Sequence, residues 1–185
     1  MTWLDRLLRD WRIGKAKREI PHGARLLDIG TYDGTLFGIV GVPGVGIDPM
    51  LSAPIEVSDG VVLVRGFFPQ DLPTEPASSF DAVTALAVIE HVTDGELRRW
   101  AVELARLLKP GGVLVITVPS PVVDHILRVL LRLRLVAGME AHQHHGFAPG
   151  NVPRLFAEPQ WRLVKHQRFQ LGLNNLYVFQ RIDRA

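Results

Sequence analysis

The stretch Leu26-Leu27-Asp28-Ile29-Gly30-Thr31-Tyr32-Asp33-Gly34 decides the expected fold. Residues 25–29 form a largely apolar run of strand length, and the two glycines permit a tight turn or a close approach of the backbone. Residues 35–40 can then open a helix. A strand that runs into an acidic, glycine-containing turn indicates a ligand-binding edge of an α/β sheet.

Two acidic residues indicate which ligand this turn suits. Asp28 stands at the carboxyl end of the first strand, and Asp48 ends the next apolar strand, residues 45–47. A dinucleotide fold also places an acid at the end of its second strand, about 20 residues after its first glycine, so Asp48 does not choose between cofactors. Asp28 does help, because a carboxylate at the turn repels a pyrophosphate and attracts a cofactor with an ammonium group, such as S-adenosylmethionine.

At these residues the sequence resembles the class I S-adenosylmethionine-dependent methyltransferases. Their first motif runs Asp-x-Gly-x-Gly-x-Gly, and here Tyr32 stands where glycine is most common. Residues 80–92 resemble the fourth strand of that family and the turn after it, and residues 107–119 resemble its next helix end, turn and fifth strand. The subgroup most similar in appearance is the ubiquinone/menaquinone-biosynthesis type, which shares the pair Glu90-His91.

The resemblance implies an α/β fold with a doubly wound, mostly parallel seven-stranded sheet, Rossmann-like, and an antiparallel C-terminal hairpin. It also implies S-adenosylmethionine as cofactor and a small-molecule acceptor. The residues expected at the cofactor are Asp28, Gly30, Tyr32, Gly34, Asp48, Pro49, Phe67, Phe68 and Ala87.

The loop of residues 66–73 is expected to face the adenine. Phe67 or Phe68 could stack on the base while Asp71 or backbone groups contact its amine, although core packing of one phenylalanine is an equal alternative. Tyr32 is expected to keep a negative φ, because a positive φ carries a steric cost for tyrosine.

Length and composition suit a single domain over residues 1–185, with 47% hydrophobic and 22% charged residues. The absence of cysteine excludes disulfides and thiolate ligands, and the charged residues near the N-terminus leave no uninterrupted secretion signal, so a cytoplasmic location is expected. Residues 21–121 hold twelve acidic and six basic residues, whereas residues 122–185 hold four and nine. An acidic cradle suits a cationic cofactor, and a basic C-terminal part suits an anionic acceptor, with solvated surface arginines as the equal alternative.

Residues 1–20 predict an amphipathic helix. Gly14 and Pro21 break the helical pattern before the first strand. Its apolar stripe consists of Trp3, Leu4, Leu7, Leu8 and Trp11. The stripe packs on the domain, over the cofactor mouth, or lies on a membrane surface, so peripheral membrane contact is one alternative. No transmembrane segment and no nucleic-acid partner are expected.

Further along the chain, a short polar segment leads to a third strand at residues 61–64. The run Thr93-Asp94-Gly95-Glu96 predicts a capping box and a helix that Pro110-Gly111-Gly112 stops. Residues 113–118 predict a central parallel strand, and residues 161–164 and 176–179 predict the last two strands.

The segment of residues 121–157 is expected to form a lid or a wall of the substrate pocket, with one helix at residues 122–136 and a short one at 152–157. His91 is a candidate base or substrate contact, with helix packing as the equal alternative. His144 and His145, with His142, are candidate substrate contacts, with a local structural role as the alternative, and a metal site is not expected.

Two alternatives to a methyltransferase remain open. A binding module of the same fold without turnover is supported by Tyr32. A nicotinamide-dependent oxidoreductase would also have an acid at the position of Asp48. The three glycines of its Gly-x-Gly-x-x-Gly fingerprint would fall on Gly30, Tyr32 and Thr35, so only one of them is present. The sequence does not identify the methylated atom or the oligomeric state.

Overall fold

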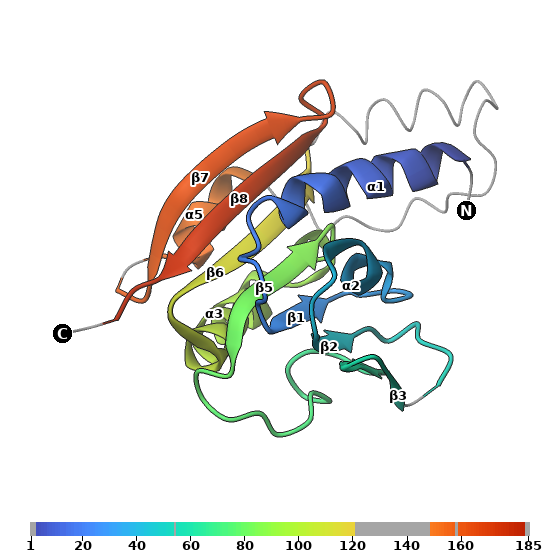
Figure 1. Ribbon diagram of the computed structural model, residues 1–185. Helices are drawn as coiled ribbons and strands as arrows, with labels where there is room; N and C mark the ends of the chain where they lie inside the picture. The colour runs from blue at the N-terminus through green and yellow to red at the C-terminus, as the bar shows by residue number, and fades with distance from the viewer. Residues whose placement is uncertain (1–2, 54, 121–148, 158, 184–185) are drawn as a thin grey trace.

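The computed structural model describes residues 3–53, 55–120, 149–157 and 159–183, which form one mixed sheet between two layers of helices (Figure 1). The strands are β1 Leu26–Ile29, β2 Gly44–Ile47, β3 Ile55–Ser58, β4 Val61–Val64, β5 Phe80–Leu86, β6 Leu108–Pro119, β7 Trp161–Phe169 and β8 Asn174–Arg181. The helices are α1 Trp3–Lys17, α2 Thr35–Val40, α3 Asp94–Leu107 and α5 Val152–Leu155, with short 3-10 turns η1 Ile89–His91 and η2 Pro149–Asn151.

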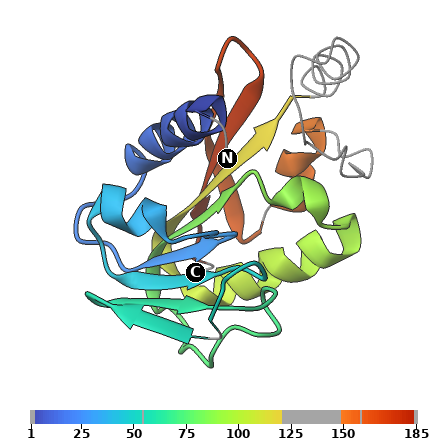
Figure 2. The same ribbon diagram turned by 90° about the vertical axis from the view of Figure 1, so that its right-hand side faces the viewer.

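The spatial strand order is β3-β4-β2-β1-β5-β6-β8-β7. Strands β4, β2, β1, β5 and β6 run parallel, whereas β8 pairs antiparallel with β6 and β7 antiparallel with β8. The expected doubly wound α/β class with an antiparallel C-terminal hairpin is therefore confirmed. Helices α1 and α2 cover one face of the sheet and α3 covers the other (Figure 2).

The described part of the chain forms an eight-stranded sheet, one strand more than the expected seven. Strand β3 occupies the segment expected to be a polar link, and it pairs antiparallel with β4 at the edge of the sheet. Asp59 and Gly60 join the two strands with positive φ values of 48° and 79°, as a two-residue hairpin turn requires. The Asp59-Gly60 pair is a hairpin-turn signal in the sequence, and the exposure of Ile55 and Val57 indicates that pairing with β4 rather than burial holds β3.

Helix α3 begins as its sequence predicts. The Thr93 hydroxyl accepts the Glu96 N–H, and a Glu96 carboxylate oxygen accepts the Thr93 N–H at 3.1 Å, which completes the capping box. The helix ends at Leu107, but β6 begins at once rather than at Val113. Residues 109–112 form a bulge, because Phe80 pairs with Leu108 while Ala82 pairs with Val113.

Helix α1 corrects two expectations. It continues through Gly14, which lies inside the helix. It packs through Ile13 and Ala16, whereas Leu7 and Trp11 of the expected apolar stripe stay 54% and 46% exposed. Among the side chains of α1 that the structure describes, the buried ones therefore lie in the C-terminal half of the helix. Among the described residues, no helix is long and apolar enough to cross a membrane.

The last two strands are confirmed as a hairpin, and both are longer than expected. Trp161 anchors β7 by donating its indole N–H to the Ala101 carbonyl of α3 at 3.2 Å. Of the expected lid segment, residues 121–148 lie outside the described residues. Its described end, η2 and α5, packs beside α3, and the Tyr177 hydroxyl of β8 donates to the Pro149 carbonyl at 2.9 Å.

The β1–β2 register predicts that Gly44→Ala destabilises the protein. A Cβ at Gly44 would lie 1.9 Å from the Leu26 carbonyl oxygen, so the strands must separate, at a cost of about 3 kcal/mol or more. The control Gly38→Ala, in α2 with open space around the added methyl, should stabilise by about 0.5–1 kcal/mol. Urea unfolding measures both, and a Gly44→Ala protein as stable as the wild type would contradict this register.

Candidate functional site

A cavity of about 950 Å³ opens at the carboxyl ends of β1, β2, β5 and β6. The strand order reverses between β1 and β5, and open α/β sheets bind ligands at such a switch point. Helix α1 covers one side of the cavity through Leu8, Arg9, Arg12 and Ile13. The cavity therefore lies between the loops of the sheet and the N-terminal helix.

The turn after β1 forms the floor of this cavity. Gly30 has a φ of 77°, and a Cβ there would lie 2.2 Å from a Val88 methyl carbon, so only glycine lets the two loops approach. The expectation for Tyr32 is wrong, because its φ is 56°. The strained turn is held by Asp48, whose Oδ2 accepts the Tyr32 N–H at 2.9 Å. Gly34 lies behind the turn as the N-cap of α2, outside the cavity lining.

Asp48 joins two loops through one carboxylate. Its Oδ1 accepts the Met50 N–H at 2.7 Å, while its Oδ2 accepts the Tyr32 N–H. The residue is buried, yet it lines the cavity together with Pro49. A carboxylate has about four lone-pair sites, so Asp48 can accept further hydrogen bonds from hydroxyl groups of a ligand.

Asp28 is buried in β1 and lines the cavity. Burial raises the pKa of its carboxyl from 3.8 to about 7; the hydroxyls of Thr84 and Thr31 lower it, and nearby Asp48 raises it further. The Thr84 hydroxyl donates to its Oδ1 at 2.6 Å. Near neutral pH the Asp28 carboxyl is therefore only partly ionised, whereas the expectation from the sequence treated it as a fully ionised carboxylate. A cation beside it would favour the ionised form.

The two phenylalanines in the loop of residues 66–73 have different environments. Phe68 is buried and packs edge-on against Trp100, with ring centroids 5.1 Å apart, although it also borders the cavity. Phe67 is 66% exposed and lines the cavity, so its ring can stack on a ligand. Asp71 folds the loop, because its Oδ2 accepts the Phe67 N–H at 2.8 Å.

The turn after β5 supplies the opposite wall. Ala87 lines the cavity with a φ of 59°, and its N–H donates to the Thr117 carbonyl at 2.9 Å. His91 ends η1 and also lines the cavity, beside the buried Glu90. The other candidate histidines, His142, His144 and His145, lie outside the described residues.

Several cavity residues were not identified from the sequence. Arg9 and Arg12 of α1 lie outside the expected apolar stripe, yet both line the cavity. Gln170 and Asn174 come from the β7–β8 hairpin and carry no local motif. Gln170 Nε2 donates to the Leu8 carbonyl at 2.8 Å, and Asn174 Nδ2 donates to Gln170 Oε1 at 2.7 Å. Only the folded hairpin brings these amides to the cavity.

Residues 2–169 match the family model of a methyltransferase domain. The ubiquinone biosynthesis O-methyltransferase of Bradyrhizobium sp. is 34% identical over 102 residues, which cover 51% of this chain and 40% of that relative. The chain spans about 40% of the length of the curated relatives it matches.

Two solved structures show the same fold. A chain in the complex of the Haloferax volcanii Trm112 methyltransferase activator with a methyltransferase gives a TM-score of 0.70 at 17% identity, covering 98% of this chain and 94% of that chain. An S-adenosylmethionine-dependent methyltransferase from Mesorhizobium loti gives 0.65 at 14% identity, covering 92% and 98%. At these identities the likeness concerns the fold alone.

The raised pKa of Asp28 predicts that Asp28→Asn stabilises the protein at pH 8 and much less near pH 5. The folded protein keeps a proton that the unfolded chain releases above its pKa of 3.8, so stability falls as pH rises toward the folded pKa of about 7. Asparagine removes the buried charge and keeps an acceptor for Thr84. Thermal unfolding across this pH range measures the gain, expected as several degrees at pH 8.

Asp33→Asn is the matched control, because Asp33 is a neighbouring acid whose pKa lies below its usual range despite partial burial, through its contacts with Thr35 and Arg9. Its effect on the melting temperature should not change between pH 5 and pH 8. An equal shift of Asp28→Asn at both pH values would contradict the assignment.

Proposed function

The chain belongs to the methyltransferase domain family, and from that membership we propose that it binds S-adenosylmethionine in the cavity and methylates a small molecule. One observation carries the proposal: Asp28, Asp48 and the glycine-containing turn after β1 line a single cavity. The family membership gives no support to a nicotinamide-dependent oxidoreductase. A binding module without turnover is the remaining alternative, which turnover measurements distinguish.

The adenosine half of the cofactor is assigned to the β2 and β4 side of the cavity. The remaining lone pairs of Asp48 suit the two ribose hydroxyls, and Pro49 lies next to it in the lining. The exposed ring of Phe67 suits stacking on the adenine, while Phe68 supports it from the core. Tyr32 borders the same space with a 54% exposed side chain.

The methionine half of the cofactor is assigned to the space between the β1 turn and α1. Its ammonium group suits Asp28, because a neighbouring cation lowers the raised pKa of that carboxyl and favours its ionised form. Its carboxylate suits the guanidinium groups of Arg9 and Arg12, which reach the cavity from α1. Arg9 is held near the turn by Asp33, with Nη1 and Oδ2 3.4 Å apart.

S-adenosylmethionine supplies an electrophilic methyl group on a sulfonium. The chain contributes position, because holding acceptor and methyl group in line can supply about 7–11 kcal/mol of the barrier. His91 is the candidate to take a proton from an acceptor hydroxyl at the cavity wall. An acceptor that ionises readily needs no such base. The roles of His144 and His145 as acceptor contacts remain predictions.

Much of the cavity lining is apolar. The apolar lining residues include Leu8, Ile13, Leu86, Val92, Trp100 and Pro119, and the amides of Gln170 and Asn174 add polar groups. This lining supports a small, partly apolar acceptor with at least one polar group. The curated relatives are named O-methyltransferases, which supports oxygen as the methylated atom.

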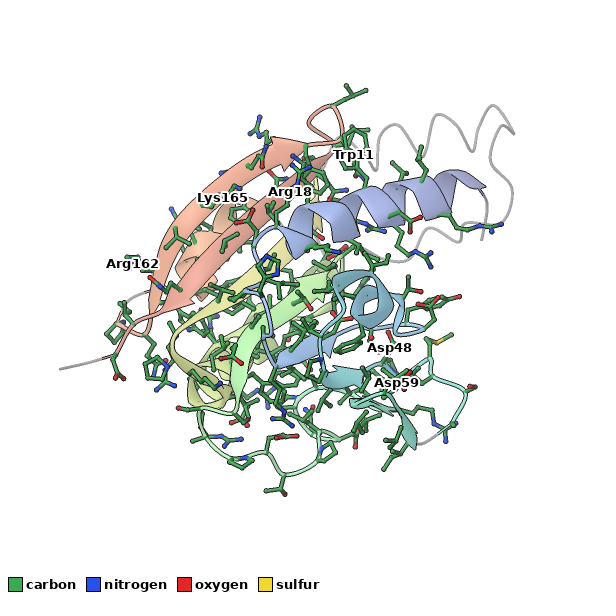
Figure 3. All side chains as sticks on the ribbon, viewed as in Figure 1. Trp11, Arg18, Asp48, Asp59, Arg162 and Lys165 are labelled. Atoms are coloured by element: carbon green, nitrogen blue, oxygen red, sulfur yellow. The ribbon has the colours of Figure 1, made fainter. Side chains whose placement is uncertain are left out.

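Calorimetric titration should show binding of S-adenosylmethionine and its demethylated product, and no binding of a nicotinamide dinucleotide. Asp48→Asn should weaken cofactor binding by about 1–3 kcal/mol, because the amide has fewer acceptor sites for the ribose and for the backbone N–H groups of Tyr32 and Met50. Asp59→Asn is the control: Asp59 lies at the β3–β4 turn (Figure 3) and is not among the cavity-lining residues, so removing the same charge there should leave the affinity unchanged. Tighter binding of the dinucleotide would contradict the cofactor assignment.

Purified protein should form demethylated cofactor with at least one member of a small-metabolite panel. Gly30→Ala should abolish this turnover, because its methyl group collides with Val88 and the backbone has a positive φ. Gly95→Ala, with open space around the added methyl, should keep it. Cofactor binding without any turnover would favour the binding module, and methylation of protein or nucleic acid alone would contradict a small acceptor.

A further inference from the structure

Asn174, the first residue of β8, holds a buried hydrogen-bond acceptor at the wall of the cavity. The residue lines the cavity and is only 8% exposed. Within the described part of the chain, its side-chain oxygen Oδ1 has no hydrogen-bond partner. Most buried polar side-chain atoms in proteins are hydrogen-bonded, because an unpaired one lowers the stability of the fold. An unpaired acceptor in a cavity wall therefore indicates a hydrogen-bond donor on the ligand.

A chain of two amides fixes which atom of Asn174 is left unpaired. The Leu8 carbonyl can only accept a hydrogen bond, so Gln170 turns its amide nitrogen toward it, and Nε2 donates at 2.8 Å. Gln170 Oε1 then accepts from Asn174 Nδ2 at 2.7 Å. Turning either amide over would bring two acceptor oxygens together. We call these three groups the amide relay, and its last atom, Asn174 Oδ1, can pair only with a donor.

The β7–β8 turn holds the amide relay in place. This turn lies beside α1 (Figure 1). The Ser120 N–H donates to the Leu173 carbonyl at 2.8 Å, and the Ser120 hydroxyl donates to the Gly172 carbonyl at 2.7 Å. Gln170 has a φ of 51°, which is uncommon for a residue with a side chain and is found most often at functional sites. The amides are therefore fixed before a ligand binds.

The strand order separates the amide relay from the acids assigned to the cofactor. Strands β5 and β6 lie between β1, which carries Asp28, and β8, which carries Asn174. Three strand spacings place β1 and β8 about 14 Å apart. Asn174 pairs instead with Pro119, the last residue of β6, which also lines the cavity. The donor that Asn174 lacks is therefore assigned to the methyl acceptor rather than to the cofactor.

We propose that Asn174 Oδ1 accepts a hydrogen bond from a hydroxyl or N–H group of the methyl acceptor and so selects molecules that carry such a group. This inference rests on the proposed function, since it assigns the β6 and β8 side of the cavity to a methyl acceptor. An ether, carbonyl or carboxylate at this place would set a second oxygen against Oδ1 and leave both unpaired. The group recognised by Asn174 is therefore a donor and not an anion.

Titration of the whole, ¹⁵N-labelled chain with phenol and with anisole tests the proposal by nuclear magnetic resonance. The two probes differ in that a hydroxyl replaces a methoxy group. Phenol should bind about fivefold more tightly, as expected for one added hydrogen bond. It should also shift the side-chain amide signals of Asn174, which are identified by their loss in Asn174→Leu. The preference should appear with and without the demethylated cofactor, because the relay belongs to the chain.

Asn174→Leu removes the acceptor while nearly keeping the side-chain volume. This variant should bind phenol and anisole equally, and its calorimetric affinity for S-adenosylmethionine should stay within about twofold of the wild type, because Asn174 lies apart from the cofactor acids. Gln167→Leu is the matched control. It removes an amide from β7 of the same hairpin that is not among the cavity-lining residues, so the preference for phenol should remain.

The wild type alone can overturn the inference. Equal affinity for phenol and anisole does so, as does the absence of phenol binding. An unchanged preference in Asn174→Leu, or an equal loss of preference in Gln167→Leu, also overturns it. None of these outcomes concerns the cofactor: a wild-type chain that fails to bind S-adenosylmethionine contradicts the proposed function instead, and the calorimetric titration detects that failure separately.

Discussion

The described site depends on the hydrogen bonds that the carboxylate of Asp48 accepts. One oxygen accepts the Tyr32 N–H at 2.9 Å and the other accepts the Met50 N–H at 2.7 Å, so a single side chain fixes the loops after β1 and β2. Two backbone bonds add to this, because Gly30 and Thr31 both donate to the Ile47 carbonyl. The floor of the cavity is thus tied to the end of β2 before any ligand is considered.

This arrangement explains how a tyrosine occupies a turn position that favours glycine. A left-handed conformation costs a residue with a side chain about 1–2 kcal/mol. A hydrogen bond to a charged group contributes about 1.5–3 kcal/mol, enough to offset that cost. The expectation of a negative φ considered only the steric cost at Tyr32 itself. The acceptor that reverses the outcome stands sixteen residues later in the chain.

Local signals in the sequence predicted the parts of the fold that local physics controls. The capping box at Thr93 and the apolar run of β6 depend on neighbouring residues, and both were found. Strand β3 was missed because it depends on pairing with β4 rather than on burial. Most of the predicted cofactor residues line the cavity, since the ends of parallel strands meet at one edge. Gln170 was missed because only long-range pairing of the hairpin brings it to α1.

At Asp28 the proposed binding site and a stable core make opposite demands on one residue. Burial of a carboxyl without a cationic partner favours its protonated form and, above the unfolded pKa, lowers the stability of the fold. An apolar residue of similar size would remove that cost in β1. The same burial weakens screening by water, so a ligand cation placed beside Asp28 interacts more strongly than it would at the surface. Burial of Asp28 therefore lowers the stability of the fold and at the same time strengthens its interaction with a ligand cation. For this reason Asp28 indicates more about the ligand than about the fold.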